Sequence, residues 1–269
     1  MPIQKSDFIL VDYTGSVKET GEVFDTTSEE IAKEKKLFKE GDIFEPRLIV
    51  VGENWVLKAL DEAFLTCKLK KKETVEISPE QAFGQRDPEK IKLIPLKRLA
   101  VRGITPHLGE QIEFDKRYAT VRTIGSGRVT LDFNPPLAGK TLVYEVTVKQ
   151  QLKTDEEKIA ALIHRRVPAV EVEKFEFKVA KASVTVNMPD DSFYVEGIQL
   201  AKRGIAFDIQ RFVPELTTVK FVETFKKPEA PGQDKKEEPA TTEKAEKAEK
   251  PEKTQEPAEA AEASAEETS

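Results

Sequence analysis

Alternating apolar and polar residues predict a β-hairpin close to the N-terminus. Tyr13 lies on the apolar face of the first strand, where the alternation has the period of two expected of a half-buried strand. Gly15 and the Glu-Thr-Gly run at 19–21 predict turns, because glycine adopts a positive φ without steric cost. Phe24 and Asp25 are neighbours in the returning strand. The hairpin therefore gathers a phenol, an apolar ring and a carboxylate, which by themselves also fit an ordinary packed hairpin with a solvated acid.

Two helices and two more strands are expected next. The charged segment 28–44 predicts a surface helix that begins at a serine N-cap and ends near Gly41. Apolar runs predict strands at 47–51 and around 73–77. Between these strands lies an amphipathic helix, with Asn54 as a candidate N-cap and an apolar stripe that faces the core. The stripe consists of Val56, Ala59, Leu60, Ala63 and Phe64.

Residues 90–133 interrupt this pattern with short strands of their own. The strands are predicted around 112–114, 118–122 and 129–133. A structureless loop of this length is uncommon in a compact domain, so we expect a small β-rich module. The last strand of the first domain follows only at 142–148. Its apolar face carries Leu142, Tyr144, Val146 and Val148.

A further α+β domain is expected after residue 153. Thr154 and Glu157 have the spacing of a capping box at the start of a helix, whose apolar stripe contains Ile159, Leu162 and Ile163. The remaining elements are strands at 172–179 and 183–188, a helix at about 197–211 and a strand at 217–224. Beyond them, 228–269 has no aromatic or large aliphatic residues to bury, so disorder is predicted there.

Charge and cysteine content narrow the class of protein. The tail 228–269 holds six lysines and thirteen acidic residues, so its net charge of −7 leaves the rest of the chain nearly neutral. Neither a nucleic-acid footprint nor a membrane span or signal peptide is evident, so we expect a cytoplasmic protein. The single Cys67 excludes an internal disulfide and fits a small buried residue. His107 and His164 are far apart in sequence, and we expect neither a metal nor a cofactor.

Four stretches, in this order, resemble an FKBP-type peptidyl-prolyl cis-trans isomerase of the long, SlyD-like form common in archaea, which carries an insertion in its flap. They are VDYTGSVKETGEVFDTT at 11–27, VVGENWVLKALDEAF at 50–64, AFGQRDPE at 82–89 and NPPLAGKTLVYEV at 134–146. The resemblance implies an α+β fold, with an FKBP-like antiparallel half-barrel wrapped on a short helix. Its predicted domains are 1–89 plus 134–150 for the isomerase, 90–133 for a β-rich flap module, 154–226 for a C-terminal α+β domain, and the disordered tail 228–269.

The resemblance also implies a proline site. The family's catalytic positions match Tyr13, Phe24, Asp25, Phe83 and Tyr144. The substrate-binding positions match Val56, Leu57, Leu60 and Leu137. Rotation about an X–Pro bond breaks no covalent bond but faces a barrier of about 18–20 kcal/mol. A water-poor aromatic pocket with few polar groups suits this reaction, because it favours the twisted amide over the planar one.

Several positions depart from the family pattern. Phe83 stands where a tyrosine hydroxyl usually donates to the bound peptide, and Leu60 stands at a floor position that is tryptophan in the human prototype. Arg47 falls where an apolar wall residue is common, unless Phe44 fills that place. The motif at 134–140 has proline where the long form usually has histidine. We expect reduced or altered isomerase activity rather than none.

The inserted module of the long form binds unfolded chains, so unfolded or nascent polypeptides with X–Pro bonds are the expected partners. Residues that could contribute are Ile104, Leu108, Ile112 and Tyr118, which also fit the module's own core. The alternative function is a peptide-binding chaperone or interaction protein with little isomerase activity. Lysines at 68–72 make the ribosome a candidate partner, although a solvated surface is the better explanation, because no exposed aromatic residues are interleaved with them. We expect a monomer.

Overall fold

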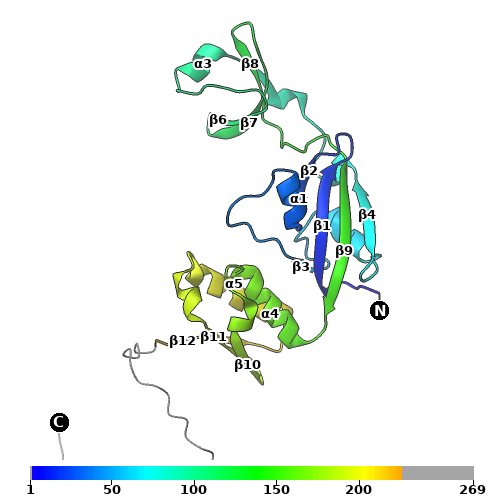
Figure 1. Cartoon of the computed structure of the whole chain (residues 1–269), viewed down its shortest axis with the longest axis vertical. Helices are drawn as coiled ribbons and strands as arrows, with labels where there is room; N and C mark the ends of the chain where they lie inside the picture. The colour runs from blue at the N-terminus through cyan, green and yellow to red at the C-terminus, as the bar shows by residue number, and fades with distance from the viewer. Residues whose placement is uncertain (1, 226–269) are drawn as a thin grey trace, which may run out of the picture. The chain divides into compact units, whose positions relative to one another are not determined.

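The computed structural model of the chain describes residues 2–225 (Figure 1). These residues form three β-sheets and few helices, and strands pair antiparallel throughout two of the sheets. The predicted mixed α+β class with antiparallel sheets is therefore confirmed. The segment 228–269, for which the sequence predicts disorder, lies outside the described residues.

The first sheet has five strands in the order β2-β1-β9-β4, and β3 also pairs with β1. Its strands are β1 (Phe8–Val17), β2 (Val23–Thr26), β3 (Arg47–Val50), β4 (Lys72–Ile77) and β9 (Leu142–Leu152). Figure 1 shows β1 and β9 side by side, and their pairing runs along the whole length of β1. The N-terminal hairpin and the last strand of the first domain, more than a hundred residues apart, are thus direct neighbours.

The inner face of this sheet packs against the short helix α2 (Lys58–Phe64) to form one apolar core. Leu60 and Phe64 contribute the helix side of that core, as the sequence predicts. The predicted apolar face of β9 is also confirmed, since its four residues are all buried. Each large apolar side chain buried here contributes about 1.5–3 kcal/mol. The core therefore holds the helix against the two central strands.

Two predictions for the N-terminal segment are wrong in detail. Gly15 lies inside β1 and not in a turn, whereas Gly21 does lie in the turn, with a φ of 67°. The charged helix is only α1 (Glu29–Glu34) and does not reach Gly41. Ala32 is its only buried residue, so little packing stabilises a longer helix at this position.

The predicted N-cap of α2 is also wrong. Leu57 is the residue that precedes the helix, and Asn54 has a φ of 54° in the turn before it. The backbone N–H groups of Gly52 and Asn54 donate to the buried carboxylate of Asp61, each at 2.9 Å. Asp61, a residue of the helix, therefore holds the turn that leads into it. These hydrogen bonds take the place of the predicted cap by the Asn54 side chain.

The second sheet lies within the segment 90–133. Its strands are β5 (Ile91–Pro95), β6 (Gln111–Phe114), β7 (Arg117–Gly125) and β8 (Arg128–Asp132), with α3 (Leu96–Ala100) after β5 and the short 3₁₀ helices η1 (Pro79–Gln81) and η2 (Pro88–Lys90) before it. The strand order is β5-β8-β7-β6. Three of these strands are predicted from the sequence, whereas β5 and α3 are not. The sheet has an apolar core of its own that includes Leu99, Phe114, Val121 and Leu131.

The third sheet lies near the C-terminal end of the described residues. Its strands β10 (Glu176–Ala180), β11 (Ser183–Met188) and β12 (Thr218–Glu223) are accompanied by α4 (Asp155–Arg166), α5 (Ile198–Phe212), η3 (Val172–Lys174) and η4 (Asp190–Tyr194). The capping box of Thr154 and Glu157 is confirmed, and the stripe of α4 is buried. The strand predicted over 172–179 is shorter, because its first residues form η3.

The C-terminal elements share one core with the first sheet. Phe8 and Val50 belong to the same buried cluster as Ile159 and Ile209. The rings of Phe8 and Phe212 meet edge to face, with 5.6 Å between their centroids. Apolar packing therefore joins β1 and β3 to α4 and α5.

A polar clamp lies where the second sheet connects to the first. The carboxylate of Asp132, which is 1 % exposed, accepts hydrogen bonds from Arg86, from Arg122 at 3.1 Å, and from the backbone and side-chain nitrogens of Asn134 at 3.0 and 2.8 Å. The side chain of Asn134 in turn bonds the backbone of Asp87 in both directions. The chain entering the second sheet is thereby tied to the chain leaving it.

We predict that Asp132→Asn lowers the free energy of unfolding by about 2 kcal/mol, because the variant leaves buried donors unsatisfied. Burial acts to raise the pKa of Asp132, but the hydrogen bonds from Asn134, Arg122 and Arg86 outweigh it and lower the pKa. Because the pKa of Asp132 is lowered in the folded state, the stabilisation by its carboxylate is complete above about pH 4. It is lost as the pH falls through the pKa of the folded state.

Urea unfolding at about pH 7 and about pH 3 measures both effects. Asp115→Asn is the matched control, because Asp115 pairs with Arg102 on the surface of the same sheet and an exposed pair contributes at most about 1 kcal/mol. Equal losses in the two variants, or a loss for Asp132→Asn that does not shrink in acid, would contradict the clamp.

Candidate active site

Four of the predicted site residues converge on the first sheet. The Tyr13 hydroxyl, on β1, donates to Asp25 Oδ2 on β2 at 2.8 Å. The ring of Tyr144, on β9, lies 6.1 Å from that of Tyr13 and 5.7 Å from that of Phe24, measured between centroids. Tyr13 and Tyr144 are buried, whereas Phe24 and Asp25 are half-buried. Three strands thus bring together three rings and one carboxylate.

Gly15 allows these strands to approach so closely. It pairs with Asp25 on one side and with Tyr144 on the other. A Cβ atom at this position would lie 2.8 Å from the Phe24 ring and 3.0 Å from the Tyr144 ring. Such contacts are too short for carbon atoms, so only glycine fits between the two aromatic side chains as they stand. The sequence alone does not reveal this role, because a glycine at this position also fits the predicted turn.

The environment keeps both phenols protonated. Burial, followed by the hydrogen bond to Asp25 and its charge, raises the pKa of Tyr13. Burial and the charge of Asp25 raise the pKa of Tyr144 to about 12. Tyr13 is therefore a neutral donor to the carboxylate at physiological pH. The guanidinium of Arg47 lies over the Tyr13 ring, 5.6 Å from its centroid, and so adds a positive charge beside the rings.

The four predicted substrate-binding residues belong to the same apolar cluster. Leu60 is buried in it, and the half-buried Val56, Leu57 and Leu137 pack against it. Leu57 is the N-cap residue of α2, and its backbone N–H has no hydrogen-bond acceptor among residues 2–225. The cluster therefore combines apolar side chains with one free backbone donor at the start of the helix.

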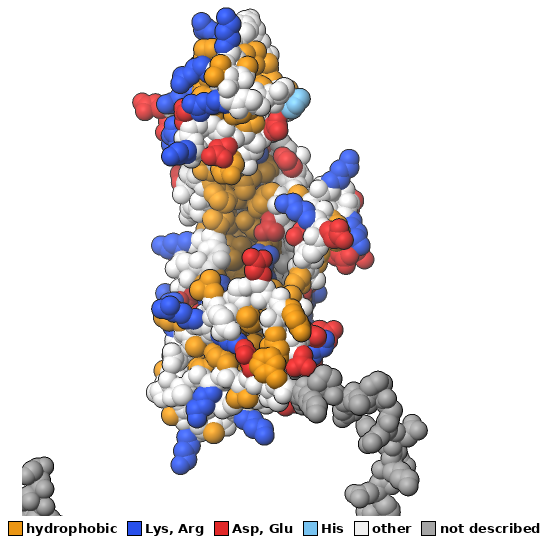
Figure 2. All heavy atoms as spheres, turned by 90° about the vertical axis from the view of Figure 1, so that its left-hand side faces the viewer, with side chains coloured by type: hydrophobic (Ala, Val, Ile, Leu, Met, Phe, Trp, Pro, Cys, Tyr) orange, Lys and Arg blue, Asp and Glu red, His pale blue; other side chains and the backbone are white. Residues whose placement is uncertain are grey.

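Phe83 lies to one side of the four converging residues. Its side chain is 43 % exposed and lines a cavity of about 330 Å³ that also contacts Phe24 and Leu137. Other walls of this cavity are Val17, Glu22, Pro135, Pro136 and Lys140. Figure 2 shows hydrophobic side chains gathered in a hollow on one face of the molecule. Phe83 and Phe24 therefore line the same cavity, and Tyr13 is not part of its lining.

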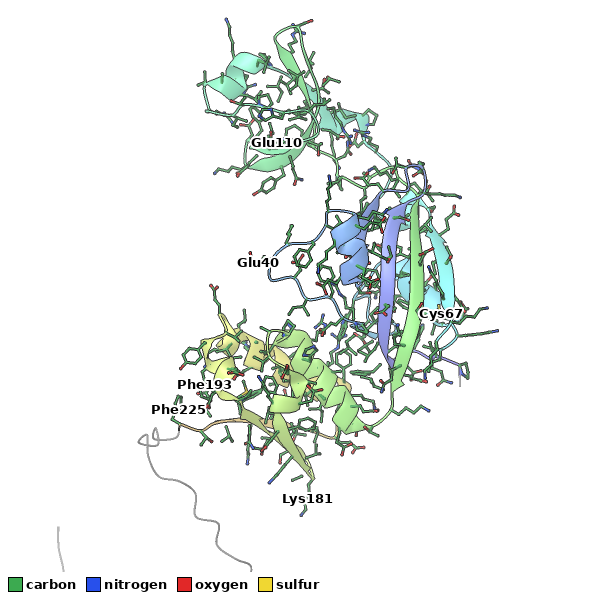
Figure 3. All side chains as sticks on the ribbon, in the orientation of Figure 1. Glu40, Cys67, Glu110, Lys181, Phe193 and Phe225 are labelled. Carbon is green, nitrogen blue, oxygen red and sulfur yellow. The ribbon has the colours of Figure 1, made fainter. Side chains whose placement is uncertain are left out.

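Cys67 has no place in this chemistry. It is labelled in Figure 3 and lies 7 % exposed behind α2, where its thiol donates to the carbonyl of Ala63 at 3.4 Å. Burial, followed by the charge of Glu73, raises its pKa to about 11. The predicted role of Cys67 as a small buried residue is confirmed.

Within residues 2–225 no cluster of three His, Cys, Asp or Glu side chains could hold a metal, and no helix has the length and apolar character to cross a membrane.

Known proteins share this combination of sequence features. Over 147 residues the chain is 35% identical to a short-type peptidyl-prolyl cis-trans isomerase of Methanocaldococcus jannaschii, covering 55% of this chain and 92% of that protein. The chain belongs to the FKBP-type peptidyl-prolyl cis-trans isomerase family. A second relative, a probable FKBP-type 16 kDa isomerase of Pseudomonas fluorescens, is 32% identical over 108 residues, covering 38% of this chain and 71% of the relative.

A further relative and two family models also match this FKBP-type chain. The SlyD isomerase of Helicobacter pylori is 29% identical over 125 residues, which cover 45% of this chain and 66% of that protein. A family model described as "FKBP26, IF domain" matches residues 92–137, and one described as "FKBP26_C-terminal" matches residues 155–226. The prediction that the chain is an enzyme, an FKBP-type isomerase, is therefore confirmed.

We predict that Gly15→Ala reduces kcat/KM for a short proline peptide at least tenfold, because the new methyl group displaces the rings of Phe24 and Tyr144. The overpacking should also cost about 1–3 kcal/mol of folding free energy. A protease-coupled isomerisation assay and urea unfolding measure the two effects. Gly125→Ala is the control, because nothing lies within 4 Å of its added Cβ. Wild-type activity in folded Gly15→Ala would rule out this packing constraint.

Proposed function

We propose that the chain catalyses rotation about X–Pro bonds in unfolded polypeptides at the pocket around Tyr13, Phe24, Asp25 and Tyr144. The observation that carries the proposal is the convergence of these four side chains beside Gly15, with Tyr13 bonded to Asp25. Family membership supports the reaction class. Val56, Leu57, Leu60, Phe83 and Leu137 complete the proposed site.

The chemistry needs no nucleophile. The proline ring would pack on Phe24 and Tyr144, in a pocket that excludes water from the amide. A twisted amide has lost its resonance, so its carbonyl is more ketone-like and tolerates an apolar wall better than the planar form does. The free N–H of Leu57 would hold the peptide backbone. Asp25, oriented by Tyr13, would face the reacting amide.

Phe83 and Leu60 limit the expected rate. Phe83 has no hydroxyl to donate to the peptide, and one neutral hydrogen bond of this kind is worth about 1 kcal/mol. Leu60 makes a smaller floor than the indole of the human prototype. The proposed enzyme is therefore an isomerase of reduced or altered activity, and the other walls of its pocket are intact.

We also propose that the segment 90–133 binds unfolded chains and raises their concentration near the pocket. Support comes from large apolar side chains on its surface, since Val101 is 89 %, Leu108 71 % and Tyr118 66 % exposed. By contrast, Ile112 is buried and Ile104 packs on the module's core, so these two belong to that core. A weakly held chain would present its prolines to the pocket repeatedly.

The proposed domains are those expected from the sequence. They are 1–89 with 134–150, then 90–133, then 154–226, and the tail 228–269. The expected partners are unfolded or nascent polypeptides, with the ribosome as a candidate. The cytoplasmic location and the monomeric state also stay predictions, and sedimentation of the full chain measures the second.

We predict that the protein accelerates a proline-limited refolding reaction, and that Phe24→Ala or Asp25→Ala reduces this acceleration at least tenfold. The variants should still suppress aggregation, because the proposed chain-binding surface is intact. Refolding fluorescence and light scattering measure the two activities. Phe193→Ala is a control at an aromatic residue outside the site. Failure of the wild type to accelerate refolding at any concentration would favour the peptide-binding chaperone without isomerase activity.

We predict that the triple variant Val101→Ser, Leu108→Ser and Tyr118→Ser separates the two proposed activities. Its kcat/KM on a short peptide should stay within about twofold of wild type, while acceleration of protein refolding falls at least fivefold, because the surface no longer attracts the unfolded chain. A matched control replaces the exposed Val179, Leu200 and Phe207 by serine. Equal losses on peptide and protein would refute the two-part mechanism.

A further inference from the structure

A cavity of about 490 Å³ lies beside the proposed proline site, between β3 and α4. Val56, a proposed substrate-binding residue, forms part of its wall. Arg47 also lines it, and the Arg47 guanidinium lies over the ring of Tyr13. A peptide bound at Tyr13 and Val56 therefore has this cavity next to it.

Two arginines of the cavity lie on aromatic rings. The guanidinium carbon of Arg165, on α4, is 3.8 Å from the centroid of the Trp55 ring, and that of Arg47 is 5.6 Å from the centroid of Tyr13, a looser contact. A guanidinium held against a ring by a cation–π contact can still use its N–H groups to bind a carboxylate. The closer contact thus restrains Arg165 as a donor, which reduces the entropy lost on binding.

The positive charge in this cavity is only partly neutralised. Arg166 donates to Asp208 at 2.7 Å, and Arg165 lies 3.7 Å from the same carboxylate oxygen, so two arginines share one acid. Glu45 is bonded to His164 at 2.7 Å. Arg47 has no ion-pair partner within the described part of the chain. The walls therefore carry an excess of positive charge.

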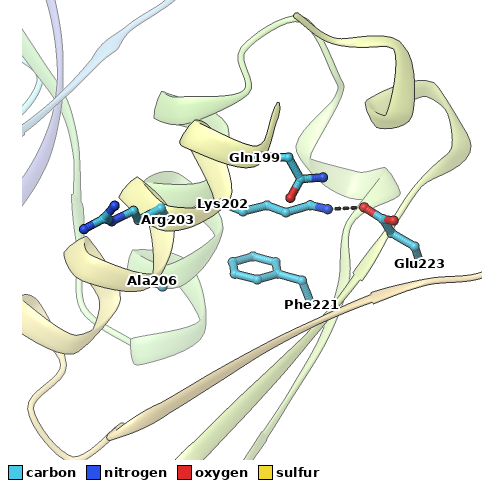
Figure 4. Close-up of a pocket in the computed structure, with 6 residues that line it drawn as sticks. All are labelled: Gln199, Lys202, Arg203, Ala206, Phe221 and Glu223. Carbon is cyan, nitrogen blue, oxygen red and sulfur yellow. Dashed lines mark hydrogen bonds and ion pairs between the residues drawn. The ribbon is translucent and has the colours of Figure 1, made fainter. Parts of the chain in front are cut away.

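A second hollow differs in how its charges are arranged. Gln199, Lys202, Arg203 and Phe221 line a cavity between α5 and β12, where Lys202 points at Glu223 and pairs with it, whereas Arg203 points away from this pair (Figure 4). The lysine of this hollow is therefore already paired with an acid of the protein. His164 also lines the cavity beside β3, and its Nδ1 atom is buried without a hydrogen-bond partner among residues 2–225. The unpaired cation of this cavity is Arg47, which lies next to the proposed proline site.

We propose that this cavity is a specificity subsite, in which Arg47 and Arg165 bind an acidic side chain of the substrate next to its proline. The inference rests on the proposed function in one respect, which is that the same peptide must bind at the proposed proline site, whether or not it is isomerised there. A carboxylate can accept two parallel N–H bonds from a guanidinium. The subsite is open to solvent, so the expected gain is the three- to fivefold of a screened ion pair, about 0.6–1 kcal/mol.

The test compares short peptides that differ at one position. Two series carry Glu, Gln or Lys directly before or directly after the proline, and kcat/KM is measured with the full chain. For wild type, in one of the two series, kcat/KM should be about three- to fivefold higher for the Glu peptide than for the Gln peptide. It should be lowest for the Lys peptide. The ratio of kcat/KM for the Glu peptide to that for the Gln peptide should fall toward one at about 1 M salt, where charges more than about 3 Å apart are screened.

Variants assign the preference to the cavity. Arg47→Gln and Arg165→Gln should each reduce the ratio of Glu to Gln peptide, whatever their absolute rates, and Arg47→Lys should retain part of it. Arg117→Gln is the matched control, because Arg117 also lies on an aromatic ring, that of Phe133. A ratio near one in wild type for both series, or a ratio that survives both glutamine variants, overturns the subsite.

Binding separates this inference from the proposed function. Trp55 is the only tryptophan in the chain and lines the cavity, so its fluorescence reports occupancy. If the neutral peptide is not isomerised, the proposed function fails. The subsite still stands if the Glu peptide binds about three- to fivefold more tightly than the Gln peptide in a Trp55 titration. Equal affinities in that titration overturn it independently of catalysis.

Discussion

The close approach of β2, β1 and β9 at Gly15 is the constraint on which the site depends. Because Gly15 has no side chain, the rings of Phe24 and Tyr144 can meet over the strand. Tyr13, two residues earlier on the same face, then reaches Asp25. The sheet register therefore determines which side chains meet, and the hydrogen bond and ring contacts hold them in position. None of these groups has to move for the proposed reaction, which suits a reaction that needs a preorganised pocket.

The C-terminal elements affect the site although they lie far from it in sequence. Phe8 and Val50, at the ends of β1 and β3, are buried together with residues of α4 and α5. This shared core places Arg165 against Trp55, opposite the strand that carries Arg47. The cationic cavity beside the proposed proline site thus follows from the packing of the C-terminal helices, and without them it would lack the wall that α4 forms.

The sequence predicts the elements better than the contacts between them. The apolar alternation of β9 and the stripe of α4 are strong local patterns, and the structure confirms both. The ordered motifs also identify the four residues that converge. The role of Gly15 was missed because it depends on the register of three strands. The length of α1 was wrong because only Ala32 is buried there, and the clamp at Asp132 was missed because Arg86 lies 46 residues away.

The polar clamp and the apolar pocket have different physical requirements, and this difference explains why they are separate. A twisted amide is favoured where water and strong dipoles are few, so charged groups directly under the proline ring would act against the reaction. The surface proposed to capture unfolded chains must instead be exposed and apolar. Asp132 and Asn134 tie the chain entering the second sheet to the chain leaving it, and they place no charge among the rings. Asp25 and Arg47 are the exceptions, and both lie at Tyr13. Asp25 accepts the hydrogen bond of its hydroxyl, and Arg47 lies over its ring, where we propose that the charge selects a substrate.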